Sequence, residues 1–228
     1  MIARFVAAAG LAAALVAPAA ADPAPPPVWA NDFTARLAAL AVLQSLNADL
    51  LGHDSATLTL DRWCDAHHLA SPAKVVAERD RSAHKPATAE QRQLLHVSAS
   101  EPIGFRHVRL VCGTHVLSEA DNWYVPSRLT AEMNHQLDTS DVAFGRAVAA
   151  LHFRRQTLAA RLLWSPLPDG WDVAPAALPD AAAKALAIPH DVLQHQAVLT
   201  LPDGTPISEV VETYTREVLA FPQPRPAR

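Results

Sequence analysis

The feature that most constrains the fold is a pair of β-rich runs near the C-terminus. Residues 192–201 and 207–219 are rich in β-branched side chains, and five residues separate them. The separating segment, Pro202 to Pro206, contains an Asp-Gly pair, which favours the backbone of a tight turn. These residues predict a hairpin, so the chain is expected to contain an antiparallel sheet.

Helices come first along the rest of the chain, and strands follow them. We expect helices at 29–51, 57–68, 130–137 and 142–151, and strands at 75–76, 94–97, 105–112, up to 125 after a turn at 113–114, and at 153–164. Half of the residues are hydrophobic and 18% are charged, which allows a sizeable core and excludes global disorder. This order predicts an α+β fold with a single antiparallel sheet, with N-terminal and inserted helices packed around it. The domain is expected to span 29–221, with a surface excursion at 165–185 and a frayed tail at 222–228.

The first residues have the features of a secretory signal. Arg4 is followed by an apolar run over 5–16, and Ala19 and Ala21 form a small-x-small cleavage pattern. The run is shorter than the roughly 20 residues that span a bilayer. We therefore expect a signal peptide at 1–21, a proline-rich lead at 22–28, and a periplasmic or secreted protein without an integral membrane segment after cleavage.

Composition narrows the classes of partner and chemistry. The formal net charge is −4 and there is no basic block, which argues against nucleic acid. Eleven histidines are present, but adjacent His67 and His68 would point apart on a helix, and the spacings of common zinc motifs are absent. No metal or other cofactor is expected. Cys64 and Cys112 can pair in an oxidising compartment or remain two separately buried thiols, and both alternatives stay open.

Glu212 is the most informative candidate for a site. In the last predicted strand, Val210, Glu212 and Tyr214 share a face, while the opposite face is polar, so the first should point inward. A buried carboxylate without a partner costs several kcal/mol. Glu212 is therefore expected to form a salt bridge with a nearby arginine or to belong to a ligand cavity.

Arginines are the natural partners of this carboxylate. Arg109 lies in the 105–112 strand on the same face as His107 and opposite Arg106, and Arg154 and Arg155 open the 153–164 strand, one on each side. An arginine that converged with Glu212 on a cavity would suit a small acid, because a guanidinium group holds a carboxylate through paired hydrogen bonds.

Several fragments together resemble the chorismate pyruvate-lyase family. They are Asp54-Ser55-Ala56-Thr57, Val108-Arg109-Leu110-Val111-Cys112, Val125-Pro126, Phe144-Gly145-Arg146, and Gly204-Thr205-Pro206 leading to Val211-Glu212. The resemblance implies a single antiparallel sheet with helices around it, a fold shared with the ligand-sensing domains of GntR-type regulators. It also implies an enclosed pocket for 4-hydroxybenzoate and a reaction that needs no cofactor.

The resemblance assigns roles to particular residues. The family's glutamate carries over to Glu212, while its two arginines fall on His107, with Arg109 on the same face, and on Asn122. Glu212 and Arg109 are thus the candidate catalytic residues, and His107, Asn122, Arg155 and Tyr214 the candidate ligand-binding residues.

Three hypotheses follow. In the first, the chain is an exported, monomeric binding protein with an enclosed pocket for a small carboxylic acid, aromatic by the resemblance. In the second, it is an active lyase that converts chorismate to 4-hydroxybenzoate and pyruvate. In the third, it has a structural or interaction role and Glu212 belongs to a buried ion pair.

Overall fold

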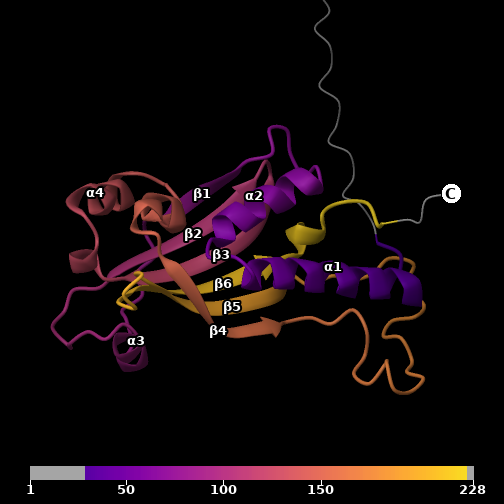
Figure 1. The fold of residues 1–228 in the computed structure, drawn as a ribbon. Coiled ribbons are helices and arrows are strands. Elements are labelled where there is room, and N and C mark those ends of the chain that lie inside the picture. The colour runs from indigo at the N-terminus through magenta and orange to yellow at the C-terminus, as the bar shows by residue number, and fades with distance from the viewer. Residues whose placement is uncertain (1–28, 225–228) are drawn as a thin grey trace, which may run out of the picture.

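A computed structural model describes residues 29–224, and within them six strands form one antiparallel sheet (Figure 1). The strands are β1 (Val75–Asp80), β2 (Gly104–Cys112), β3 (His115–Tyr124), β4 (Arg154–Leu162), β5 (Asp191–Thr200) and β6 (Pro206–Thr215). Their order across the sheet is β1-β2-β3-β6-β5-β4. The predicted α+β fold class is therefore confirmed, as is the C-terminal hairpin. The predicted signal peptide at 1–21 and lead at 22–28 lie outside the described residues.

The helices of the described region are short, except for the first. They are α1 (Phe33–Leu51), α2 (Ala56–Ala66), α3 (Ala89–Leu94), α4 (Ala131–Thr139) and α5 (Phe144–Ala147), with 3-10 turns η1 (Pro126–Arg128), η2 (Ala149–Leu151) and η3 (Arg216–Leu219). The helix predicted at 142–151 is thus divided into α5 and η2, and the last strand ends at Thr215 rather than at 219.

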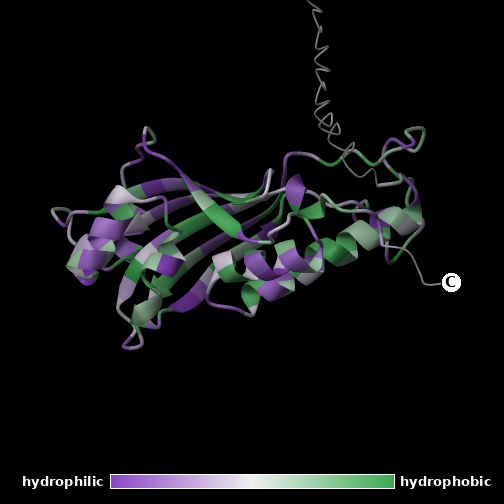
Figure 2. Ribbon diagram, turned by 90° about the horizontal axis from the view of Figure 1, so that it is seen from above, coloured by the Kyte–Doolittle hydropathy of each residue, from purple (hydrophilic) through white to green (hydrophobic). Residues whose placement is uncertain are grey.

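One face of the sheet is covered by two groups of helices. Helices α1 and α2 pack Leu43 and Leu60 against a core that includes Leu110 and Tyr214 of the sheet. Helices α4 and α5 form a second cluster with other sheet residues, among them Leu199. Figure 1 shows α1 and α4 toward opposite ends of the sheet, and Figure 2 shows hydrophilic bands within the mostly hydrophobic strands. Between these two groups of helices, the covered face of the sheet carries the polar residues Asn122 and Glu212.

The opposite face carries a smaller apolar cluster, around α3. The 94–97 segment, which we predicted as a strand, instead begins with the last residue of α3, a helix whose N-terminus is closed by a capping box between Thr88 and Gln91. Leu95 then packs against Trp123. A Thr-x-x-Gln pattern is a known helix-start signal, and in this segment it outweighs the strand-like run of apolar residues.

Two features fix the helices and the long loop to the sheet. Cys64 in α2 and Cys112 at the end of β2 form a disulfide, which decides between the two alternatives that the sequence left open. Arg36 in α1 donates to the carbonyl oxygens of Pro166 and Pro179 and so holds the 165–185 excursion. None of the described helices has both the length and the apolar character that crossing a bilayer requires.

Candidate functional site

A cavity lies on the covered face, where the two groups of helices meet. Its floor includes Val108, Ala120 and Val210, which belong to one small apolar cluster of the sheet. Its walls come from the start of α2, from α5 and from the start of β4. The lining residues are Asp54, Ser55, Ala56, Thr57, Val108, Leu110, Ala120, Asn122, Ala143, Phe144, Gly145, Phe153, Arg155, Leu199, Val210 and Glu212. The open space is about 50 Å³, which is small for an organic ligand.

Glu212 lies at this cavity and is paired. Arg155 donates from Nη2 to the Glu212 carboxylate over 2.5 Å, and the two side chains are 4% and 8% exposed. The Tyr214 hydroxyl donates to the same carboxylate oxygen over 3.1 Å. The prediction that Glu212 faces inward is confirmed, and Arg155 is the arginine that reaches it from the edge strand β4.

The Glu212 carboxylate favours the charged form of Arg155. Burial alone would lower the pKa of Arg155, but the Glu212 carboxylate raises it above its ordinary value. Burial, together with the same carboxylate, raises the pKa of Tyr214 well above its usual range. The pair is therefore a neutral unit, with Tyr214 as a neutral donor behind it.

Asn122 and Arg155 leave hydrogen-bonding capacity at the cavity. Asn122 is 4% exposed, and its side-chain oxygen has no partner among residues 29–224. The Arg155 Nε group likewise has no partner within the described chain. Buried polar groups are nearly always satisfied, so this pair of an acceptor and a donor is suited to a bound polar molecule.

The start of α2 closes one wall. Asp54 accepts a hydrogen bond from the Arg155 backbone N–H over 2.8 Å, which ties α2 to β4. Ser55 caps the helix by accepting from the Leu58 N–H. The N-terminus of a helix carries partial positive charge, so this wall adds a weak attraction for a ligand oxygen.

His195 lies behind the ion pair and was missed in the sequence analysis. It is fully buried in β5, and its Nε2 lies 2.8 Å from Asn47 Oδ1. Burial, with a further effect from Arg155, lowers the pKa of His195 to about 4, so the imidazole is neutral at pH 7. The inward-facing alternation of β5, which buries Leu193, His195 and Ala197, is the sequence signal that could have identified it.

Three predicted site residues do not line the cavity. Tyr214 contacts it only through Glu212, and Arg109 and His107 lie elsewhere. Arg109 donates to Glu78 over 2.6 Å, with both side chains about half exposed. His107 lies 2.8 Å from Asp121. Both point to the face of the sheet opposite Glu212, because the inward positions of β2 are Arg106, Val108 and Leu110. The expected convergence of Arg109 and His107 with Glu212 is wrong on geometric grounds.

The chemistry that the cavity offers is hydrogen bonding by the buried Arg155–Glu212 pair and Asn122, with the Asp54 carboxylate at one wall. Within residues 29–224, no three His, Cys, Asp or Glu side chains are grouped closely enough to hold a metal ion. The charge of Arg155 is matched by Glu212, while Asn122 and the Arg155 Nε group stay available.

A relative with high sequence identity is known. No protein-family model matches the chain. The uncharacterized protein y4mC of Sinorhizobium fredii is 59% identical over 197 residues, which cover 86% of this chain and 83% of y4mC. The chain belongs to the y4mC family. At this identity the two proteins share their fold.

Solved structures resemble the chain more distantly. PhnF from Mycobacterium smegmatis has a TM-score of 0.48 and 12% identity, covering 78% of this chain and 71% of PhnF. The PhnF effector domain has a TM-score of 0.43 and 15% identity, covering 71% and 88%. A GntR-family regulator from Bacillus cereus has a TM-score of 0.38 and 11% identity, covering 68% and 99%. Similarity at this level has no bearing on the activity of the y4mC family.

Proposed function

We propose that the protein is a monomeric binding protein for a small carboxylic acid, held in the cavity beside Glu212. The supporting observation is that three segments far apart in the sequence meet at this cavity. They are Asp54 to Thr57, Phe144-Gly145 and Glu212, and each belongs to the fragments that resemble chorismate pyruvate-lyases. Their convergence on one cavity is more than a shared fold requires, and it favours a site for a related ligand.

The available hydrogen-bonding groups suit an acid that also carries a hydroxyl. A ligand carboxylate would accept from the Arg155 Nε group, which Glu212 does not use. A ligand hydroxyl would donate to Asn122 Oδ1. Hydrogen bonds to charged groups contribute about 1.5–3 kcal/mol each, so Arg155 is the expected anchor in place of Arg109.

The size of the cavity implies movement on binding. An aromatic acid needs more room than the open space of about 50 Å³. The part of the lining that we expect to move is the contact between the start of α2 and α5. There the Gly145 backbone lies close to the Ser55 hydroxyl. An ion pair between Arg146 and Asp61 holds this contact. We expect ligand entry to displace α5, with the sheet unchanged.

Thermal shift tests the binding proposal. We expect 4-hydroxybenzoate to raise the Tm of the wild type, and the neutral 4-hydroxybenzamide to do so less. Arg155→Ala should abolish the shift, and Glu212→Ala should enlarge it, because loss of the carboxylate frees the charge of Arg155. Arg154→Ala should retain the shift, because Arg154 is exposed and does not line the cavity. Equal shifts in all four proteins would refute the site. No shift with any small acid would favour the structural role, with Glu212 as a buried ion pair.

The lyase reaction is the second candidate, favoured by the position of Glu212 at the cavity. Chorismate carries two carboxylates, but Arg155 is already paired with Glu212 and Arg109 lies on the other face. We therefore rank binding above turnover. Release of 4-hydroxybenzoate from chorismate by the wild type, lost in Glu212→Ala and kept in Arg154→Ala, would reverse this ranking.

We also propose that the protein works outside the cytoplasm, in the periplasm or after secretion. The signal-like residues 1–21 support this location, and the Cys64–Cys112 disulfide suits an oxidising compartment. Fractionation of cells, with maleimide labelling of free thiols, tests it. The expected result is a processed protein in the periplasm or medium without reactive thiols, and an unprocessed protein with two reactive thiols in the cytoplasm would contradict it.

A further inference from the structure

A second buried arginine lies on the covered face, outside the lining of the cavity. Arg106 in β2 is 1% exposed and is the cross-strand neighbour of Asn122. Its Nη2 group makes one long contact, 3.4 Å to the Ser140 carbonyl oxygen. Its Nε and Nη1 groups have no partner among residues 29–224. A guanidinium group is thus buried with most of its donors unused.

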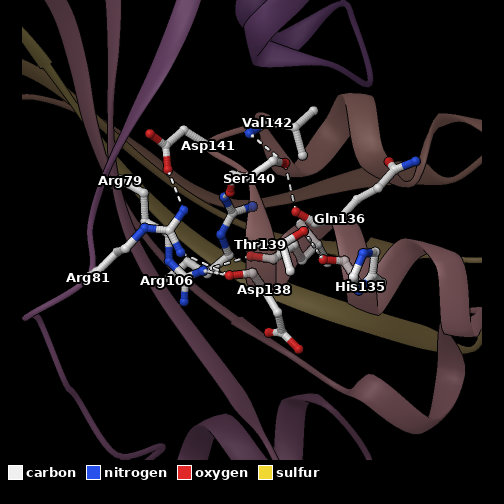
Figure 3. A network of polar contacts seen from close by, with 11 residues as sticks. Arg79, Arg81, Arg106, His135, Gln136, Asp138, Thr139, Ser140, Asp141 and Val142 are labelled. Atoms are coloured by element: carbon white, nitrogen blue, oxygen red, sulfur yellow. Dashed lines mark hydrogen bonds and ion pairs between the residues drawn. The ribbon is translucent and has the colours of Figure 1, made fainter.

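The charges around Arg106 increase the need for an anion. Arg79 of β1 and Arg81, which directly follows β1, lie beside it, at the C-terminal end of α4 (Figure 3). Arg79 donates to the Leu137 carbonyl oxygen over 2.7 Å, and Arg81 donates to the Asp141 carboxylate over 2.8 Å. Asp141 is therefore already paired with Arg81. The Arg79 Nε group also lacks a partner in the described part of the chain.

Arg106 remains charged under ordinary conditions. Burial, together with the nearby positive charge of Arg79, lowers the pKa of Arg106 to about 10. This value is still well above neutral pH. A buried charge without a counter-charge is unfavourable, and proteins normally pair such groups.

A purely structural role explains Arg79 and Arg81 but not Arg106. The last carbonyl groups of a helix need donors, and basic side chains often supply them. Arg79 and Arg81 do this for α4. Buried Arg36 shows what a structural arginine looks like in this protein, because its Nε, Nη1 and Nη2 groups all donate to oxygen atoms. Arg106 has no such set of acceptors within the described chain.

We propose that Arg106, Arg79 and Arg81 form a binding site for an oxyanion, a phosphate or carboxylate group of a small molecule. A guanidinium group has two planar edges with paired donors, Nε with Nη2 and Nη1 with Nη2, and each edge matches two oxygens of such a group. Nε and Nη1 are unpartnered in the described chain and Nη2 makes one long contact, so either edge of Arg106 can take up the anion. The anion would lie beneath the 139–142 segment, which follows α4 and covers Arg106 through Ser140. The exposed ion pair between Arg81 and Asp141 is the contact that holds this segment closed. This site is separate from the cavity at Glu212 and does not depend on the function proposed for it.

Thermal denaturation of the whole chain in inorganic phosphate tests the site. At ten times Kd, a ligand that binds the folded state alone raises the Tm of a protein of this size by about 3–5 °C. We expect phosphate to raise the Tm of the wild type above the value in sodium chloride of equal ionic strength. Parallel titrations with acetate and succinate decide whether the site prefers a phosphate or a carboxylate group. No shift with any of the three anions would overturn the proposal.

Variants separate the site from a general salt effect. Arg106→Met should remove the anion-dependent shift and yet raise the Tm without anion, because an unpaired buried charge is gone. Arg36→Met is the matched control, and it should lower the Tm and keep the anion response. Glu212→Ala should also keep it, which distinguishes this site from the proposed function. An anion response that survives in Arg106→Met would refute the assignment, as would a loss of Tm in that variant as large as in Arg36→Met.

Discussion

Two buried arginines on the same face of the same sheet differ in how their charges are balanced. Arg155 on β4 donates to Glu212, and the two side chains form a neutral unit beside the cavity. Arg106 on β2 is equally hidden, but most of its donors have no partner among residues 29–224. The chain thus supplies its own anion at one end of the covered face and not at the other. A charge that the protein itself balances supports stability and offers a ligand only its remaining donor, here the Arg155 Nε group, whereas an unbalanced charge suits an anion.

The largest expected effect comes from breaking the balanced pair. Arg155→Met leaves the Glu212 carboxylate buried without its cation, so we expect a loss of about 3–5 kcal/mol in the free energy of unfolding. Urea denaturation measures it. Arg154→Met is the matched control on the preceding residue, where an exposed pair with Asp54 contributes about 0.2–1 kcal/mol.

A double variant sharpens this test. Arg155→Met with Glu212→Met removes both charges, and such replacements are often nearly neutral. We expect the double variant to be more stable than Arg155→Met alone. If the two losses simply add, the pair is not coupled and the account of a neutral unit is wrong.

The second largest effect is expected from pH. Acid should lower the free energy of unfolding through His195, which lies beside the Arg155–Glu212 pair. Its pKa is about 4 in the folded protein and about 6.5 in an unfolded chain. The unfolded state therefore binds more protons between these values, and stability falls as the pH drops from about 6.5 to 4. A shift of this size corresponds to about 3 kcal/mol.

The variant His195→Gln isolates this effect. Glutamine remains neutral and can still donate to Asn47, so unfolding free energies measured from pH 7 to 4 should fall less steeply than in the wild type. The exposed His135 provides a control, because His135→Gln should leave the slope unchanged. Identical slopes for the wild type and His195→Gln would show that His195 does not carry the acid sensitivity.

The fold could be predicted from the sequence to a large extent. The hairpin around Asp203-Gly204 and the strand up to Cys112 followed from local patterns, and the structure has both. The errors lie where a local pattern is ambiguous. In α1, for example, the apolar residues Phe33 and Leu37 are four apart, as on one helix face, but they are 47% and 37% exposed, because the buried side of α1 begins at Ala35 and Arg36.

The site was harder to predict, because it depends on which face of a strand each residue occupies. Glu212 was placed correctly, since its own strand alternates clearly. Arg109 was not, because the resemblance placed the family's first arginine at His107, and His107 and Arg109 lie on the face opposite Arg106, Val108 and Leu110. A shift of one residue in such a match reverses the face of a side chain. The pairing of Arg155 with Glu212 involves β5 as an intervening strand, which no local pattern reveals.

For Arg106, whose charge is not balanced, we predict the opposite effect on stability from that expected for Arg155. Arg106→Met removes a buried charge and fills a similar volume, so we expect the free energy of unfolding to rise by about 2 kcal/mol without added anion. Urea denaturation in a buffer free of phosphate, sulfate and carboxylates measures it. A loss comparable to that of Arg155→Met would mean that Arg106 is balanced within the protein and that the contrast between the two ends is false.

The smallest effect should come from the ion pair over Arg106. Arg81 and Asp141 are 50% and 53% exposed, and exposed pairs contribute about 0.2–1 kcal/mol. Arg81→Met should therefore leave global stability almost unchanged. Its effect on local opening of the 139–142 segment should be larger, because this segment loses its ion pair with Arg81, next to β1. Faster hydrogen exchange at the Ser140 and Val142 amides, with unchanged exchange in β6, would identify this segment as the part that opens toward Arg106, whereas unchanged exchange throughout would leave Arg106 closed to an anion from this side.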